Sequence, residues 1–180
     1  RNKIKNLRKN FVDIKILNGI EVDILNDGSL DYSNDILSGF DFVIASIHTG
    51  FEQDKEKITN RIVKAMQNPY VNIIAHPQGR ILARRKAYEV DMEKVIHTAR
   101  ETSTCLEINA SPNRLDLDPE MARKASEEKV KLVINTDAHH IKQLKDMKFG
   151  VSVARRAWLS KDDVINTMEF EELKKYLNNN

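Results

Sequence analysis

The residues best suited to chemistry are histidines and an aspartate that directly follow short apolar runs. Such runs, rich in β-branched residues, are typical of strands buried on both faces of a parallel sheet, and ligands gather at the carboxyl ends of those strands. Imidazoles and carboxylates without thiolates are ligands that zinc, manganese and iron prefer. The sequence therefore predicts a divalent metal centre. The ligands that it predicts from these runs are His48, His76, Asp137 and His139.

Two of these residues, Asp137 and His139, are separated by a single position. In an extended chain, side chains two positions apart point the same way, so the two groups are expected to project together from one strand end. Any one histidine is better explained as an ordinary core or loop residue. Three of the five histidines at predicted strand ends, one of them paired with an aspartate, are together better explained by metal binding.

Segment 20–25 alternates apolar and acidic residues with the two-residue period of a strand, which places Glu21 and Asp23 on one face. A carboxylate such as Glu21 can bridge two divalent ions, and clustered ions hold a phosphoryl oxygen and activate the water that attacks phosphorus. This interpretation predicts phosphoester hydrolysis. The solvent face of an edge strand explains the two acids equally well, so both interpretations stand.

Alternating strands and helices must position these residues. Apolar runs and alternation predict strands at residues 12–17, 20–25, 42–48, 71–77, 105–110, 131–137 and 149–153. Helical spacing predicts helices at residues 4–11, 35–40, 54–66, 91–102, 118–129, 141–147, 160–168 and 170–177. Strand–helix units of roughly 25 to 35 residues predict a parallel sheet with right-handed crossovers. Because the predicted ligands follow several different strands, a barrel is favoured over an open sheet.

Capping residues mark several of the predicted helix starts. Their side-chain oxygens can accept hydrogen bonds from the unpaired amides of a first helical turn. A proline directly after the cap, or an acid three residues later, strengthens the signal. The caps are Asp54, Asp91, Asp118 followed by a proline, and Ser160, which resembles a capping box with Asp163.

Two further groups of polar residues could serve the same site. Strand 105–110 places Glu107 and Asn109 on one face, where they would point into the site or hold metal ligands by hydrogen bonds. In the loop after His76, Arg80 offers a planar bidentate donor for phosphate. Arg80 is the first of four basic groups within seven residues, ending at Lys86. A solvated basic loop explains this cluster as well as a phosphate site does.

The composition is that of an ordinary globular protein, with 41% apolar and 31% charged residues in a chain of 180. The length suits one domain. A net charge of +2 does not by itself argue for nucleic acid. No stretch approaches the roughly 18 apolar residues of a membrane span, and no signal-peptide pattern opens the chain. A cytoplasmic protein with no membrane partner is expected.

Three other residues that could do chemistry are expected to have structural roles. Cys105 lies alone in an apolar run with no neighbouring histidine, which favours a buried thiol in a reducing compartment over a nucleophile. His97 lies inside a helical pattern rather than at a strand end. His140 faces away from His139 by strand parity, so it is expected to be a surface neighbour.

The strand-end motifs resemble those of the PHP (polymerase and histidinol phosphatase) domain. They occupy residues 19–24, 45–48, 75–77 with 79–80, 106–110 and 135–139. With the loop 76–80 and the late segment 149–159, the fuller pattern is similar to the C-terminal PHP domain of bacterial family X DNA polymerases. The resemblance covers nearly the whole chain, and five motifs in the same order make it specific.

This resemblance implies a distorted TIM-like (β/α)7 barrel that binds up to three divalent ions, manganese first, with zinc or iron as alternatives. It implies a 3′-to-5′ exonuclease that acts on the 3′ ends of DNA primers and is joined to polymerase domains of the same polypeptide. Carried over residue by residue, it makes Glu21 the bridging ligand and places His48 and His76 on the second metal. Asp137 and His139 become the final metal-binding pair. These five residues form the implied catalytic centre.

The remaining assignments are our own. Glu107 and Asn109 are expected to support the metal ligands by hydrogen bonds. Arg80 and Arg114 are expected to hold the phosphate of the substrate. Glu107 and Asn109 match a recurrent motif of the family, but the supporting role is our assignment.

The chain departs from the family pattern at its start. The pattern begins with an H-x-H strand end and further ligands, and none of these precedes Glu21. Residues 1–180 are therefore expected to be a single PHP domain fragment, lacking the first strands, from a longer DNA polymerase. Glu21, His48 and His76 could still form one metal site, whereas Asp137 and His139 would lose their partners, leaving the exonuclease incomplete.

Two other functions remain open at this point. The first is a small-molecule phosphatase of the same superfamily, such as one that acts on histidinol phosphate. The second is a non-catalytic domain that braces a polymerase, with metal as a structural staple.

Overall fold

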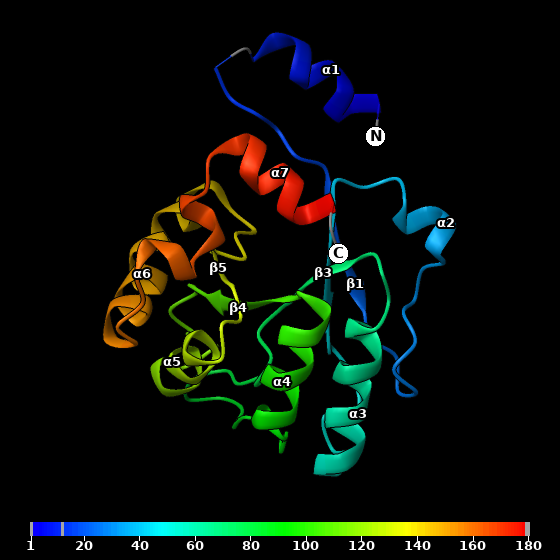
Figure 1. The fold of residues 1–180 in the computed structure, drawn as a ribbon, viewed down its shortest axis with the longest axis vertical. Helices are drawn as coiled ribbons and strands as arrows, with labels where there is room; N and C mark the ends of the chain where they lie inside the picture. Colours follow the sequence, from blue (N-terminus) through cyan, green and yellow to red (C-terminus); the bar gives the residue numbers. More distant parts are fainter. Residues whose placement is uncertain (1, 12, 179–180) are drawn as a thin grey trace.

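The computed structural model describes residues 2–11 and 13–178, and its centre is a five-stranded parallel sheet (Figure 1). The strands are β1 (Gly19–Asp23), β2 (Phe42–Ser46), β3 (Val71–Ile74), β4 (Cys105–Asn109) and β5 (Leu132–Asn135). Each strand pairs with the next one in the sequence, and all neighbours are parallel. Sequential order with helical crossovers is the arrangement of a β/α barrel wall, so the predicted α/β class is confirmed.

Helices follow most of the strands and cover one face of the sheet (Figure 1). The α-helices are α1 (Asn2–Asn10), α2 (Asn34–Leu37), α3 (Lys55–Met66), α4 (Met92–Thr102), α5 (Pro119–Glu127), α6 (Met147–Arg156) and α7 (Phe170–Asn178). Three 3₁₀ helices complete the set, namely η1 (Ile141–Asp146), η2 (Lys161–Asp163) and η3 (Ile165–Thr167). Over the described residues, no helix is both long and apolar enough to cross a membrane.

The caps of three long helices form as the sequence predicted. Asp54 accepts a hydrogen bond from the Lys57 amide at 2.9 Å, which starts α3. Asp91 and Asp118 cap α4 and α5 in the same way. Each such cap contributes about 1 kcal/mol, because it satisfies an amide that has no partner within the helix. These caps fix where the helices begin after each strand-end loop.

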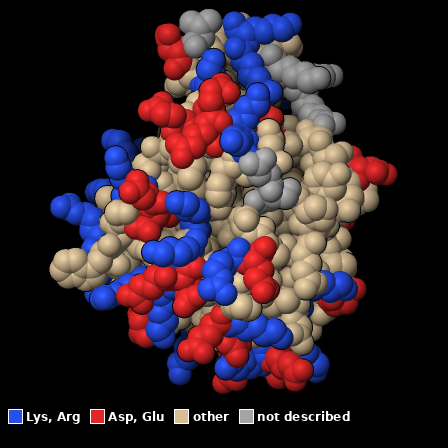
Figure 2. Space-filling model, viewed as in Figure 1, with Lys and Arg blue, Asp and Glu red and all other residues tan. Residues whose placement is uncertain are grey.

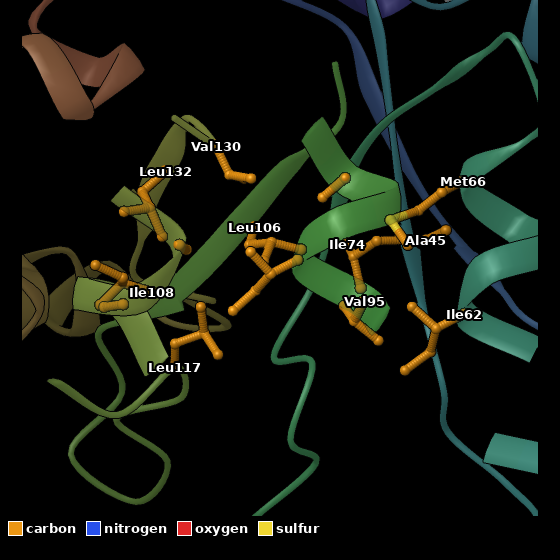
Figure 3. Close-up of a cluster of buried hydrophobic side chains, with 14 of the residues drawn as sticks. Ala45, Ile62, Met66, Ile74, Val95, Leu106, Ile108, Leu117, Val130 and Leu132 are labelled. Atoms are coloured by element: carbon orange, nitrogen blue, oxygen red, sulfur yellow. The ribbon is translucent and has the colours of Figure 1, made fainter. Parts of the chain in front are cut away.

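The main core lies between the sheet and the helices on its outer face (Figure 3). The core side chains labelled in Figure 3 are at most 3% exposed, and they are Ala45, Ile62, Met66, Ile74, Val95, Leu106, Ile108, Leu117, Val130 and Leu132. Burying a side chain of this size stabilises the fold by about 1.5 to 3 kcal/mol. The core therefore fixes α3, α4 and α5 against the strands whose ends carry the site.

The opposite face of the sheet is apolar at one end and polar at the other. Ile73, Cys105 and Val133 form a smaller buried cluster there, packed against Leu173 and Tyr176 of α7. Side chains two positions apart share a face of a strand, so Glu107 points to the same side as Cys105. This second cluster supports the strands beneath the polar end, where the site lies.

Both outer strands have their free edges partly covered. Residues 29–31 bend back on β1, where the Asp31 carboxylate accepts a hydrogen bond from the Asp23 amide at 3.0 Å. Beyond β5, Asn166 exchanges two hydrogen bonds with the backbone of Ile134, at 2.7 and 2.9 Å. Unpaired strand edges can pair with the strands of another chain, and these contacts limit such pairing.

The predicted strand at residues 12–17 is wrong for residues 13–17, and Val12 lies outside the described residues. Instead β1 pairs in parallel with β2, and segment 13–17 is held by single contacts such as that from Arg8 Nε to the Ile16 carbonyl, at 2.7 Å. Ile14 is 62% exposed, so an apolar side chain of the alternating segment remains in solvent. Alternation alone was not sufficient to make a strand.

The predicted strand at residues 149–153 is also wrong, because these residues lie within α6. Gly150 faces the sheet, and a Cβ at this position would clash with Ile134 Cγ2 and lie 2.7 Å from Ala110 Cβ. With Val153 and Ala154, it forms the buried face of the helix. The small residue lets the helix approach β4 and β5 closely, which a strand prediction from the local β-branched residues could not anticipate.

Two other helix predictions need adjustment. The capping box of Ser160 and Asp163 is present, but it caps the short helix η2 rather than a helix extending through Met168. Residue Val164 is extended between η2 and η3, since it forms a parallel bridge with Leu132 at the edge of the sheet. Residues 141–146 form a 3₁₀ helix.

Candidate metal centre

Three adjacent strands bring Glu21, His48 and His76 together, with Glu21 inside β1 and each histidine two residues beyond the end of β2 or β3. One ligand atom from each lies within 4.8 Å of the others, and we call these three residues the ligand cluster. Glu21 Oε1 lies 3.5 Å from His48 Nε2 and 3.7 Å from His76 Nε2. Because β1, β2 and β3 are parallel neighbours, their carboxyl ends meet at the same edge of the sheet. The donor set is one carboxylate and two imidazoles, which suits zinc, manganese or iron.

The electrostatics of the cluster favour a cation. Hydrogen bonds from His48 and then His76 hold the pKa of Glu21 well below its usual range, so it stays ionised. The hydrogen bond with Glu21 raises the pKa of His48 to about 9, against the effect of burial. A proton therefore occupies the position between these side chains that a metal ion could take. Glu21 and His48 are about 40% exposed, so an ion could reach them from solvent.

Asp23 orients one of the histidines. Its Oδ1 atom lies 2.5 Å from Nδ1 of His48, on the side of the ring away from Glu21. A carboxylate on one ring nitrogen fixes the tautomer and directs the other nitrogen towards a metal. The alternation of segment 20–25 placed Asp23 on the face of Glu21 without indicating a role for it. Its spacing of two residues from Glu21 was the signal that could have identified it.

The backbone at His76 is held in an unusual conformation. Its φ is 31°, in the left-handed region that disfavours residues with a Cβ, and Asp137 has a φ of 51°. Such conformations cost about 1 to 3 kcal/mol and concentrate at functional sites. Nδ1 of His76 is buried without a hydrogen-bond partner among the described residues. It is not the nitrogen that lies 3.7 Å from Glu21, which is Nε2.

Two buried acids hold the loop that carries His76. Glu107 Oε2 accepts a hydrogen bond from the His76 amide at 2.8 Å. Asp116, fully buried, accepts from the amides of Gln78 at 3.1 Å and Arg80 at 3.2 Å. Burial raises the pKa of both carboxyl groups. Asp116 was missed by the sequence analysis, because nothing in the local pattern of its loop indicates a contact with residues 36 to 38 positions away.

Asn109 connects Glu107 to Asp137. Its Nδ2 atom lies 3.2 Å from Glu107 Oε2 and 3.2 Å from Asp137 Oδ2. Asn135 Nδ2 donates to the other oxygen of Glu107 at 2.9 Å. Glu107 and Asn109 therefore link the His76 loop to Asp137, and their role in supporting metal ligands stays a prediction.

Asp137 and His139 lie outside the ligand cluster. Asp137 lines a hollow of about 340 Å³ together with Glu21 and His76, and we call this the site hollow. The side chain of His139 is 83% exposed, and its Nδ1 lies 2.8 Å from the Asp137 carbonyl oxygen. The structure therefore brings Asp137 to the site but leaves His139 at its rim. Their role as metal ligands stays a prediction.

The two arginines proposed for phosphate have different surroundings. Arg80 Nε donates to the Arg114 carbonyl oxygen at 3.1 Å, and its Nη2 donates to that of Leu115. These bonds tie the loop after β3 to the loop after β4. Arg114 Nε lies 3.6 Å from Asp137 Oδ2, and its Nη1 has no partner among the described residues. Arg114 does not line the site hollow itself but lies against Asp137, which does, and the phosphate-binding role of both arginines stays a prediction.

The structural histidines and the cysteine lie as expected. His97 pairs with Glu101 on the exposed face of α4. His140 is exposed and accepts a hydrogen bond from the Lys142 amide at 3.2 Å. Cys105 is fully buried, and burial raises the pKa of its thiol to about 12. None of the three contributes to the ligand cluster.

Sequence comparison finds two kinds of relative, a DNA polymerase with 3′-5′ exonuclease in its name and probable phosphatases. The chain is 47% identical over 178 residues to the DNA polymerase/3′-5′ exonuclease PolX of Bacillus subtilis (strain 168), covering 99% of the chain and 31% of that protein. It is 35% identical over 184 residues to a probable phosphatase of Thermoanaerobacter sp. (strain X514), covering 97% of the chain and 72% of that protein. No protein-family model matches the chain.

Structural comparison finds a similar fold. Histidinol phosphate phosphatase from Lactococcus lactis subsp. lactis Il1403, solved in complex with zinc, L-histidinol and phosphate, matches with a TM-score of 0.60. The match covers 88% of the chain and 73% of that structure, at 16% sequence identity. At this identity, the likeness concerns the fold.

Proposed function

The chain belongs to the PHP (polymerase and histidinol phosphatase) family, and from that premise we propose that it is a 3′-to-5′ exonuclease domain acting on DNA ends. A metal-dependent phosphoesterase is the activity that the relatives and the ligand cluster support together. The finer assignment rests on the 47% identity to a polymerase with exonuclease activity in its name. The chain spans about a third of that relative, so DNA and the polymerase domains as partners are part of the proposal.

The observation that carries the proposal is the ligand cluster formed by β1 and the residues that follow β2 and β3. Glu21, His48 and His76 would hold a divalent ion, for which we propose manganese, with zinc or iron as alternatives. Such an ion polarises a phosphoryl oxygen and lowers the pKa of a bound water. Asp23 would keep Nε2 of His48 free to bind, because it occupies the other ring nitrogen.

Other residues of the site would position the phosphoester. Arg114 lies beside Asp137 with one guanidinium nitrogen free of protein partners in the described chain, so it would pair with a phosphate oxygen. Arg80 would act by holding the Arg114 backbone in place. We propose that Asp137 and His139 serve further ions, up to three in all, with ligands from outside residues 1–180. Residues 1–180 would then be part of one PHP domain in a longer polymerase.

A small-molecule phosphatase is the second candidate. It is favoured by the 35% identity to a probable phosphatase of which the chain covers 72%, and by the fold shared with a histidinol phosphate phosphatase. The site hollow, at about 340 Å³, would accept a small phosphomonoester as well as a nucleotide end. A third reading, a non-catalytic brace for a polymerase, keeps the metal only as a structural element.

The test compares two substrates with manganese supplied. In the longer polypeptide that supplies the remaining ligands, we expect a 5′-labelled single-stranded oligonucleotide to shorten stepwise from its 3′ end, with little turnover of histidinol phosphate. His48→Ala should reduce shortening by more than about 100-fold, since removing a metal ligand removes the ion's chemistry. Glu52→Ala, an exposed acid in the loop after β2, is the matched control and should retain activity.

The other outcomes separate the three functions. Turnover of the phosphomonoester without shortening of the oligonucleotide would assign the phosphatase. If the protein is folded and binds metal but shows neither activity, the result would support the non-catalytic domain that braces a polymerase. In that case His48→Ala should lower the melting temperature and change nothing else.

A further inference from the structure

The outer face of α6 exposes a tryptophan among basic residues. Lys148, Val151, Arg155 and Trp158 lie three or four positions apart and so share one face of the helix and its end. Val151 is 41% exposed and Trp158 is 82% exposed. We call these four residues, with the adjacent Arg156, the α6 face. An aromatic ring this exposed is uncommon in a monomeric protein and indicates a surface that contacts something.

Local stability does not explain the tryptophan. Trp158 follows the last residues of α6 with a φ of 61°, a left-handed conformation that favours glycine. Its amide and that of Leu159 close the helix by bonds to the carbonyls of Arg155 and Ala154, both at 3.1 Å. Any residue could make these backbone bonds, and glycine would make them without strain. The indole is therefore held outwards at a position where it adds little burial.

Positive charge dominates this part of the chain. Between Ile141 and Trp158 there are five basic residues and one acid, and α6 itself contains no acid. Within the part of the chain that the structure describes, the Arg155 and Arg156 side chains have no hydrogen bond or ion pair. Figure 2 shows basic residues gathered along the left margin, where α6 lies in Figure 1. Unpaired arginines beside an exposed aromatic ring are typical of surfaces that bind single-stranded nucleic acid.

The first residue of α6 lies at the site hollow. Met147, the first residue of α6, lines that hollow with Glu21 and His76. At about 1.5 Å per residue, the eleven steps from Met147 to Trp158 span roughly 16 Å. A stacked strand advances about 3.4 Å per nucleotide, so roughly five nucleotides would cover this distance. A strand whose end lies in the hollow could therefore reach Trp158.

We propose that the α6 face binds single-stranded nucleic acid, with a base stacked on Trp158 and phosphates paired with Arg155 and Arg156. The proposal rests on the proposed function and deepens it, because it names the substrate as a single strand that extends from the metal centre along α6. A protein partner is less well matched, since Val151 is the only aliphatic side chain of the α6 face. A duplex is also less well matched, since its base faces are not free to stack.

Trp158 is the only tryptophan of the chain, so its fluorescence reports on this face alone. The titration uses the metal-free protein in chelator, with thymidylate oligomers of two and twelve nucleotides. We expect the longer oligomer to quench Trp158 emission and the dinucleotide to quench it far less. The apparent Kd should weaken at least several-fold between 50 and 200 mM salt, as counterion release requires.

Two variants test the roles of charge and ring. Arg155→Gln with Arg156→Gln should weaken binding about tenfold, while Lys174→Gln with Lys175→Gln, an equal loss of charge on α7, should not. Trp158→Gly should weaken binding of a fluorescein-labelled oligomer by roughly 5- to 100-fold, the range for one stacked base. The same variant should melt at a higher temperature, since glycine accepts the left-handed backbone, and this excludes misfolding as the cause.

Three results would overturn the proposal. They are binding without any change in Trp158 emission, equal binding by the arginine variants and the α7 control, and emission that depends on protein concentration without oligomer. The last would assign the face to a contact between copies of the chain. Because the titration contains no metal and measures no hydrolysis, it can fail while the exonuclease assay succeeds, or succeed while that assay fails.

Discussion

Nδ1 of His48 lies 2.5 Å from Oδ1 of Asp23, while Nε2 of the same ring lies 3.5 Å from Oε1 of Glu21. The two acids of β1 therefore act on opposite sides of one imidazole. Asp23 fixes the orientation of the ring, and Glu21 faces the nitrogen that would bind metal. Both side chains are partly exposed, as an edge strand allows, yet both contact His48. The acidic residues that alternate along β1 therefore contact the site, although they lie on an exposed edge strand.

Asp23→Ala is expected to lower metal affinity by about 10- to 100-fold, because the ring of His48 loses the partner that fixes its tautomer. Isothermal titration of the protein with manganese or zinc measures the effect. Asp23→Asn keeps an acceptor without its charge and should fall between the alanine variant and the native protein. Glu52→Ala serves as the control. Equal affinity in Asp23→Ala and the native protein would show that Asp23 does not position His48.

Gly150→Ala is expected to destabilise the protein by about 1 to 3 kcal/mol, since the added methyl group meets Ile134 and Ala110. In an exposed helix, the same change would stabilise by about 1 kcal/mol. Urea denaturation measures the difference. Ser152→Ala, an exposed position of the same helix, should change stability by less than about 0.5 kcal/mol. A Gly150→Ala protein as stable as the native one would contradict the close packing of α6 on β4 and β5.

Cys105 is expected to resist thiol reagents in the folded protein. Burial raises the pKa of its thiol to about 12, so the group stays protonated at pH 8, with roughly one part in ten thousand as thiolate. An unfolded thiol, with a pKa near 8.5, should react on the order of a thousandfold faster. Timed reaction with a chromogenic disulfide, with and without guanidinium, measures the ratio. Rapid labelling of the folded protein would show that β4 is not buried as described.

Features with short-range signals could be predicted from the sequence. Asp54, Asp91 and Asp118 cap helices because the cap and the amide that it binds are three residues apart. His48 and His76 were found because an apolar run ends just before each of them. Parallel neighbours bring such ends together without any further information.

Features that depend on distant contacts could not be predicted. Gly150 lies in a helix because its missing side chain lets α6 approach β4 and β5, which only the tertiary packing reveals. Residues 13–17 alternate like a strand but find no partner to complete one. Asp116 holds the backbone of Gln78 and Arg80 from a loop 36 to 38 residues away. In each case the deciding contact lies far along the chain.

The central claim is that Glu21, His48 and His76 bind a divalent metal ion. Metal content per chain, measured by plasma mass spectrometry after loading with manganese and removal of free ions, tests it most directly. We predict about one tightly held ion for this three-ligand cluster. Glu21→Ala and His76→Ala should lose it, while His97→Ala, an exposed histidine on α4, should keep it. An absence of bound metal in the native protein, or retention of the ion by folded His76→Ala, would contradict the account.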